Sequence, residues 1–216
     1  MNGEMELDKY LVIVSKNEPL TPEKENWFKN NFDYVPYTDE DGQSCMEAET
    51  YKAYLKLVEI MKKKYHIDVD SHSAWRSVET QQKVFDELTE EYSLTWAQEH
   101  VAKPGTSEHH TGLAFDLRFK PTVVAEALRD QFNEVAKRTG IRKKVFSIMA
   151  KEGAALGLIL RYQKGKEEVT GVRPEDWHFR YVGVEHAMEM YKSGQCLEEY
   201  VKQLKDKNQT KKVGSR

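Results

Sequence analysis

The stretch SEHHTGLAFD, residues 107–116, constrains the fold most strongly, because it sets an aspartate inside an apolar run. Leu113, Ala114 and Phe115 are residues that leave water on folding. An unpaired carboxylate buried among them would cost several kcal/mol or give up its charge. Alternation along a strand places Asp116 on the sheet face opposite Phe115. A positive group is therefore expected to meet Asp116 on that face.

A second strand with one polar face is predicted in DWHFRYVG, where His178 and Arg180 alternate with aromatic side chains. If the two strands are near neighbours, His178 and Asp116 converge with His109, which lies in the turn before the first strand. Two histidines and a carboxylate form the three-ligand arrangement of catalytic zinc, whose fourth position stays open to water. Such a cation would remove the cost of burying Asp116.

The rest of the chain predicts an α+β fold, a small antiparallel sheet backed by helices on one face. Further strands are predicted at KYLVIV and LILRY, and HIDVDSHSAWRS is predicted to be a strand that runs into a polar loop. A turn is predicted at DEDGQ. Helical spacing and capping residues, Thr21 and Ser77 among them, predict helices over residues 21–32, 46–65, 78–92, 122–139, 142–156, 184–194 and 196–204.

Length and composition predict one domain over residues 1–205, with helical N- and C-terminal additions, and a flexible basic tail over 206–216. The 33 basic and 36 acidic residues give a net charge of -3, which provides no electrostatic argument for a nucleic-acid partner. Cys45 and Cys196 lie too far apart for a CxxC metal site, and they do not suggest a disulfide framework.

The N-terminal segment holds acids where a signal peptide needs positive charge, and its apolar run at residues 10–14 is too short to span a membrane. The chain as given is therefore expected in the cytoplasm, with no membrane span. An export signal removed from the N-terminus would instead place the protein in the cell wall or outside the cell.

The strings SEHHTGLAFD and EDWHFRYVG, with AWRS and TQQ upstream, resemble the zinc D-alanyl-D-alanine carboxypeptidase and dipeptidase family. That family includes vancomycin-resistance D,D-peptidases and L,D-carboxypeptidases, and its fold is related to the hedgehog signalling domain. The family pattern is Ser-x-His, six more residues and Asp, followed later by Glu-x-x-His. Every element of the pattern is present, and the resemblance spans residues 75–183.

The resemblance implies that His109, Asp116 and His178 hold one zinc ion and that Glu175 is the general base. Zinc lowers the pKa of a bound water from 15.7 toward ~7. A carboxylate three residues before a ligand would take that proton and deliver it to the leaving amine. Arg76 is expected to stabilise the oxyanion or to hold the substrate carbonyl.

The resemblance also implies substrate-binding residues. Ser107 occupies the position where the family binds the substrate backbone or its C-terminal carboxylate. Gln81 or Gln82, one helical turn beyond Arg76, is expected to line the same cleft. Glu108 is interpreted as a solvated charge.

Other residues near the motifs receive simpler interpretations. His110 adjoins His109, but the seven-residue step to Asp116 selects His109. Trp177 is interpreted as a core or cleft-wall aromatic, while Arg180 is either structural or a substrate anchor. The remaining histidines are expected to be surface or ordinarily bonded residues: His66, His72, His100 and His186.

Two positions depart from the usual family sequence. Asp176 stands where a proline is common, and Trp75 stands where a tyrosine is common. Neither position supplies a metal ligand, so the metal chemistry is unaffected. The departures bear on the substrate pocket, because an added carboxylate beside Glu175 would raise the pKa of Glu175 or repel an anionic substrate.

The function implied is a zinc carboxypeptidase that removes a C-terminal D-alanine from peptidoglycan stem peptides or their precursors. The sequence does not distinguish D,D- from L,D-specificity, and it leaves a D-alanyl-D-alanine dipeptidase and a phage-type endopeptidase as alternatives. A zinc-containing binding domain without hydrolysis is the rival from another class, and the presence of Glu175 favours the enzyme. The oligomeric state is not predicted.

Overall fold

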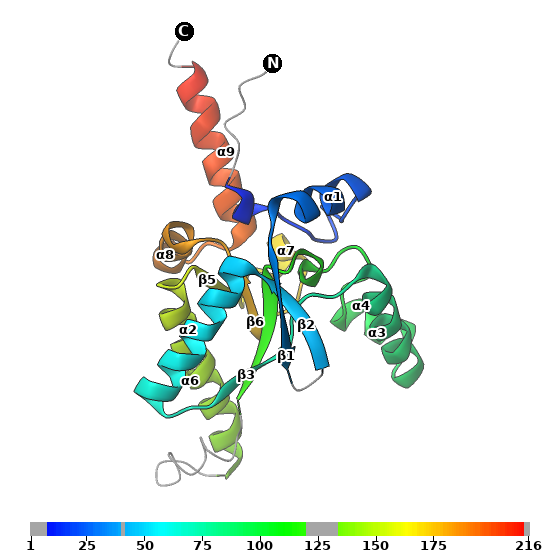
Figure 1. Ribbon diagram of the computed structural model, residues 1–216, viewed down its shortest axis with the longest axis vertical. Helices are drawn as coiled ribbons and strands as arrows, with labels where there is room; N and C mark the ends of the chain where they lie inside the picture. Colours follow the sequence, from blue (N-terminus) through cyan, green and yellow to red (C-terminus); the bar gives the residue numbers. More distant parts are fainter. Residues whose placement is uncertain (1–7, 40–41, 120–133, 214–216) are drawn as a thin grey trace.

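Four antiparallel strands form the central sheet, in the spatial order β3-β4-β6-β5 (Figure 1). Their bounds are β3 (Val69–Ser73), β4 (Ala114–Phe119), β5 (Leu158–Tyr162) and β6 (Glu175–Tyr181). A separate hairpin consists of β1 (Tyr34–Asp39) and β2 (Gly42–Glu47). This computed structural model describes residues 8–39, 42–119 and 134–213.

Helices α2 and α6 contact each other and cover one face of the sheet (Figure 1). The helices are η1 (Lys9–Leu11), α1 (Pro22–Asn31), α2 (Ala48–Tyr65), α3 (Val78–Glu91), α4 (Leu94–His100), η2 (Glu108–Thr111), α6 (Glu134–Ala154), α7 (Glu167–Thr170), α8 (Val184–Ser193) and α9 (Leu197–Val213). Within the described ranges, no helix has the length and apolar character needed to cross a membrane. The predicted α+β class is confirmed.

Local sequence signals account for several helix starts. Thr21 accepts a hydrogen bond from the Lys24 amide at the start of α1, and Ser77 accepts one from the Thr80 amide at the start of α3. These caps satisfy backbone donors that a helix cannot pair internally. Both predicted caps are confirmed. Helix α4, which Ser93 caps in the same way, was not predicted.

The register of β4 against β6 separates the core from the polar face of the sheet. Phe115 pairs with Phe179, and both belong to the core formed with α2 and α6. The next pair is Asp116 with His178. Because side chains alternate along each strand, these two polar residues share the face opposite the core. The predicted neighbourhood of the two strands is confirmed.

The predicted N-terminal strand at KYLVIV is wrong. The segment is η1 followed by irregular backbone, although Leu11 and Val14 are buried as a core strand would require. The carbonyls of Tyr10 and Val12 accept hydrogen bonds from the Arg180 guanidinium at 3.0 and 2.7 Å. A buried side chain therefore satisfies this backbone where a neighbouring strand would otherwise do so.

The two helices predicted over 122–139 and 142–156 are not separated at Gly140, because α6 is continuous there. A glycine costs a helix about 1 kcal/mol relative to alanine. Burial of Phe146 and Met149 in the core outweighs that cost. The beginning of the first predicted helix lies outside the described residues.

One smaller prediction differs from the structure, and another falls partly outside the described residues. The tail predicted to be flexible from residue 206 is helical as far as Val213, and no glycine or proline interrupts α9. Residues 40–41 of the predicted DEDGQ turn lie outside the described residues, but β1 and β2 pair on either side of them. Cys45 and Cys196 are free thiols, as expected.

Gly112 connects the histidine turn to β4 in a conformation that glycine favours. Its φ is 71°, and a Cβ built there would lie 2.5 Å from Cε1 of Tyr34. The Tyr34 ring is restrained because its hydroxyl donates to the Thr111 carbonyl at 3.0 Å. We expect Gly112→Ala to lower the free energy of unfolding by more than about 2 kcal/mol, from backbone strain plus this collision.

Gly165 provides the matched control for this prediction. It also has a positive φ, 85°, but no atom lies within 4 Å of a Cβ built there. Gly165→Ala should therefore show the backbone cost alone, about 1–2 kcal/mol. Denaturant unfolding of both variants measures the difference, and equal losses would show that the Tyr34 contact has no effect.

Candidate active site

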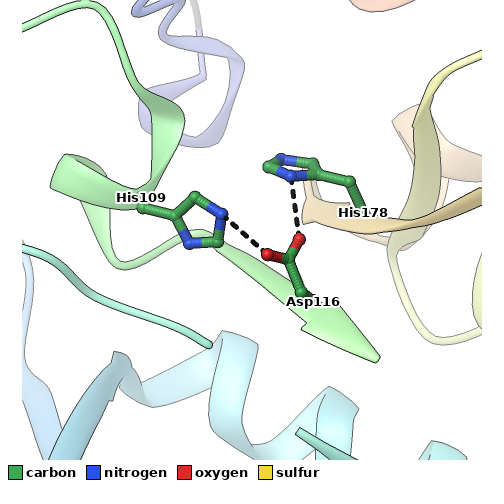
Figure 2. A group of neighbouring side chains, drawn as sticks. All are labelled: His109, Asp116 and His178. Atoms are coloured by element: carbon green, nitrogen blue, oxygen red, sulfur yellow. Dashed lines mark ion pairs between the residues drawn. The ribbon is translucent and has the colours of Figure 1, made fainter. Parts of the chain in front are cut away.

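His109, Asp116 and His178 come together on the polar face of the sheet (Figure 2). Nε2 of His109 lies 3.4 Å from Oδ2 of Asp116, and Nδ1 of His178 lies 3.1 Å from Oδ1 of the same carboxylate. All three side chains are buried, and one ligand atom from each lies within 4.8 Å of the others. The structure therefore brings together the residues predicted from the sequence.

The environment of Asp116 fits a bound cation. Its Oδ1 atom is buried and accepts no hydrogen bond, although the His178 ring is close. Leaving a buried acceptor unsatisfied costs about 1–3 kcal/mol, and more when it is charged. The two imidazole nitrogens and the carboxylate provide the nitrogen and oxygen donors that zinc takes in catalytic sites. The residues present fit zinc.

The charge states of the three side chains differ. Burial lowers the pKa of His109 to about 4, so its imidazole is neutral near pH 7. Burial alone would lower the pKa of His178 as well, but the nearby carboxylates of Asp116 and Glu108 raise it to about 9. Burial opposes the charge on Asp116, yet the two histidines hold its pKa well below the usual range. Metal binding would therefore displace a proton from His178.

Hydrogen bonds distinguish His109 from its neighbour His110. Nδ1 of His109 donates to the Ala74 carbonyl at 2.6 Å, which leaves Nε2 as a lone-pair donor facing Asp116. Nδ1 of His110 donates to the Arg76 carbonyl at 2.8 Å, and its Nε2 accepts from the Gly105 amide at 3.0 Å. Backbone groups therefore occupy both nitrogens of His110, and only His109 is free to bind a metal.

Glu175 opens β6 and lies beside the candidate ligands. Its Oε2 is 3.6 Å from Nδ1 of His178, and it lines the adjoining cleft. Burial raises the pKa of Glu175 to about 7, although His178 opposes the rise. Asp176 instead pairs with Arg142 at 3.2 Å. Arg142 therefore offsets the charge of Asp176, which the sequence suggested would disturb Glu175. Burial is the main cause of the raised pKa of Glu175.

A cleft of about 600 Å³ opens over these side chains. Arg76 reaches into it, with Nη2 3.5 Å from Oδ2 of Asp116. Its Nε donates to Ser73 Oγ at 2.9 Å, and Nη1 donates to Gln81 Oε1 at 3.1 Å. Gln81 is buried and is itself held by the Ala102 carbonyl. These bonds fix the Arg76 guanidinium at the cleft wall.

The other predicted substrate-binding residues divide between the cleft and the surface. Ser107 borders the cleft, and its Oγ accepts the His109 amide at 3.3 Å, which leaves the hydroxyl hydrogen available to a substrate. Gln82 is exposed, donates to Asp86 and does not line the cleft, so that part of the prediction is wrong. Adjacent helical residues point in different directions, and it is Gln81 that α3 turns toward Arg76.

The cleft walls include one aromatic residue expected there and two residues that the sequence did not place in the site. Trp177 lines one wall, as expected for a cleft-wall aromatic, and the Arg142 guanidinium lies 5.3 Å from its ring centre. His100 of α4 and Arg173 before β6 meet across 2.6 Å and also line the cleft. The sequence pattern did not predict this contact, because the two residues are 73 positions apart in the chain.

The interpretation of Glu108 as a solvated charge is wrong. It is only 1% exposed, and its Oε1 accepts hydrogen bonds from Arg161 and Arg180, both at 2.9 Å. Arg180, which the sequence left as structural or substrate-binding, is fully buried and structural. The available signal was an arginine within each of two apolar strands, because a buried guanidinium needs a carboxylate partner.

Fold and site together define a metallopeptidase, with a His-Asp-His group and a glutamate on the polar face of a small sheet. Residues 43–184 match the family described as VanY, D-alanyl-D-alanine carboxypeptidase. The chain belongs to this family. The match contains the whole candidate site.

Two relatives differ in how much of their length the chain covers. A D-alanyl-D-alanine carboxypeptidase of Enterococcus faecalis is 37% identical over 138 residues, which are 60% of this chain and 46% of that protein. The bifunctional D-Ala-D-Ala dipeptidase and D-Ala-D-Ala carboxypeptidase VanXYC of Enterococcus gallinarum is 29% identical over 190 residues, 88% of this chain and 92% of that protein. The chain therefore spans about half of one relative and most of the other.

Solved structures show the same fold. A vancomycin-resistance D,D-pentapeptidase VanY in complex with Zn(II) has a TM-score of 0.67 at 27% identity, covering 89% of this chain and 98% of that one. VanYB in complex with D-alanine-D-alanine has the same score and identity, covering 89% and 97%. The LD-carboxypeptidase LdcB has a TM-score of 0.63 at 28% identity, covering 88% and 84%.

Proposed function

We propose that this protein is a carboxypeptidase that uses one zinc ion to hydrolyse the peptide bond before a C-terminal D-alanine in peptidoglycan stem peptides or their precursors. The observation that carries the proposal is the placement of Glu175 beside the buried group of His109, Asp116 and His178, at the floor of a cleft. Membership of the VanY family and the D-alanine-D-alanine complex of VanYB support the substrate class.

The side chains divide the work of hydrolysis. His109 Nε2, His178 Nδ1 and an Asp116 oxygen would hold zinc, which when bound polarises the scissile carbonyl and lowers the pKa of a water. Glu175 has a pKa of about 7, so it can take the proton of the attacking water and pass it to the leaving amine. Arg76 donates to the carbonyl oxygen as negative charge develops there.

The C-terminal end of the substrate needs a further partner. Ser107, two residues before His109, presents a hydroxyl at the cleft and would donate its hydrogen to the substrate backbone or carboxylate. The structural relatives include a D,D-pentapeptidase and an LD-carboxypeptidase. The length and stereochemistry of the preferred peptide therefore have to be measured.

A panel of synthetic peptides tests the proposal. Zinc-loaded protein is mixed with D-alanyl-D-alanine, a pentapeptide ending in that dipeptide and a tetrapeptide ending in an L-centre joined to D-alanine. Mass spectrometry of the products should show release of D-alanine from at least one of them, and metal analysis should give one zinc per chain. Stoichiometric zinc without any cleavage would instead identify a binding domain.

Arg76 is predicted to act mainly in the transition state. We expect Arg76→Lys to lower kcat by about 10²- to 10³-fold, because removing one oxyanion donor costs ~2.7–4 kcal/mol. A lysine cannot keep the bonds to Ser73 and Gln81 while also reaching the substrate. Zinc content should stay at the wild-type level. Steady-state kinetics with the best peptide measures the effect, and an unchanged kcat would assign oxyanion stabilisation to another group.

A further inference from the structure

We propose that Glu108 is a positioning residue for the metal site, in which its free carboxylate oxygen holds the Nε2 proton of His178 and so leaves Nδ1 as the metal-binding atom. The inference rests on the proposed zinc site and assigns a role to a carboxylate that the hydrolytic mechanism does not use. It concerns metal affinity, which is measurable without substrate.

The two ring nitrogens of His178 face different surroundings. Nδ1 lies 3.1 Å from Asp116 and 3.6 Å from Glu175, so it points into the candidate metal site. Nε2 points away from that site, is buried and has no hydrogen-bond partner. Oε2 of Glu108 lies 3.8 Å from it. A histidine that binds metal through Nδ1 must carry its proton on Nε2.

The two carboxylate oxygens of Glu108 also differ in their surroundings. Oε1 accepts from Arg161 and from Arg180, so two guanidinium groups fix the orientation of the carboxylate. Oε2 is buried and accepts no hydrogen bond. An unsatisfied acceptor therefore faces an unsatisfied nitrogen across 3.8 Å. Hydrogen bonds in catalytic sites are often long before the site is fully assembled and shorten afterwards.

The charge of this buried cluster suits the role. Oε1 of Glu108 forms ion pairs with two buried guanidinium groups, those of Arg161 and Arg180, both at 2.9 Å, and these pairs compensate the negative charge of the carboxylate. Arg161 also donates from Nη1 to Glu198 at 2.9 Å. The two positive charges of Arg161 and Arg180 therefore balance the two negative charges of Glu108 and Glu198. An ionised carboxylate behind a metal-binding histidine fixes its tautomer and increases its basicity as a ligand.

Glu108→Gln tests the role while keeping the shape of the side chain. Arg161 and Arg180 donate only, so the amide oxygen should turn toward them and the amide NH₂ toward His178. Nε2 would then accept a hydrogen bond, and the ring proton would move to Nδ1, where it blocks metal binding. We expect the dissociation constant for zinc, measured on the full chain by competition with a chelator, to rise by about 10- to 100-fold.

Glu198→Gln is the matched control. It removes a carboxylate from the same cluster, but that carboxylate bonds Arg161 and not His178. Both variants should melt at lower temperature in the metal-free state, whereas only Glu108→Gln should weaken zinc binding. In ring-nitrogen NMR of metal-free protein, Glu108→Gln should place the His178 proton on Nδ1, while the wild type and Glu198→Gln keep a proton on Nε2.

The possible outcomes separate this inference from the proposed function. Failure of the wild type to bind zinc would remove the proposed metal site itself. Wild-type zinc affinity in a folded Glu108→Gln variant, or equal weakening in both variants, would show that Glu108 acts only in the ion cluster. If Glu108→Gln does not fold, NMR of zinc-loaded wild type decides. A downfield His178 Nε2 proton, as in a bond to a carboxylate, supports the role, and its absence overturns it.

Discussion

Replacing His109 with alanine is expected to abolish both zinc binding and hydrolysis. The substitution removes Nε2, which faces Asp116 in the candidate metal site. Zinc content after dialysis should fall to background. The melting temperature should no longer rise when zinc is added, because a ligand that binds the folded state stabilises it and an absent site cannot.

The adjacent His110 supplies the matched control. It is buried like His109, but backbone groups occupy both of its ring nitrogens. His110→Gln should lower the melting temperature, since those backbone bonds are disturbed, and should keep stoichiometric zinc. Retention of zinc by His109→Ala, together with its loss in His110→Gln, would exchange the roles of the two histidines.

Glu175→Gln is expected to separate chemistry from metal binding. The amide keeps the shape of the side chain but cannot carry the proton from water to the leaving amine. Turnover should fall by about 10²- to 10⁴-fold, the usual contribution of general acid-base catalysis. Zinc content and melting temperature should stay close to wild type, because Glu175 is not among the three clustered ligand residues.

Asp176→Asn is the control for charge next to the site. Asp176 pairs with Arg142 and lies beside Glu175 in sequence, so its loss tests whether any nearby carboxylate affects turnover. We expect only a small change. Loss of zinc from Glu175→Gln would make Glu175 a ligand. Full activity in Glu175→Gln, with a large loss in Asp176→Asn, would transfer the role of base to Asp176.

Much of the local structure was predictable because it depends on residues close together in the chain. Thr21 and Ser77 begin helices because their side chains satisfy amides three residues ahead. The alternation around Asp116 and His178 predicted two strands with one polar face each. Local sequence patterns did not predict the conformation of segments whose hydrogen-bond partners are distant in the chain. The N-terminal KYLVIV segment has strand composition, but Arg180 binds its carbonyls instead.

The sequence alone determined the chemical type of the site. A carboxylate in an apolar strand requires a positive partner, and two histidines expected to converge on it predicted a metal ion in that role. The spacing of the residues does not predict which nitrogen of each histidine faces the candidate metal site. It follows from backbone contacts made elsewhere, such as the bond from His109 Nδ1 to the Ala74 carbonyl.

Only the tertiary structure decided the surroundings of those residues. Asp116 meets His178 because β4 and β6 pair in one register, and Gln81 rather than Gln82 faces Arg76 because α3 packs in one orientation. Glu108 looks like a surface charge in the sequence, yet it is buried between arginines from two other strands. Local rules describe what a residue tends to do beside its chain neighbours. The partner of a buried charge is chosen by packing between segments far apart in the chain, where leaving the charge unpaired would cost more than any local preference can supply.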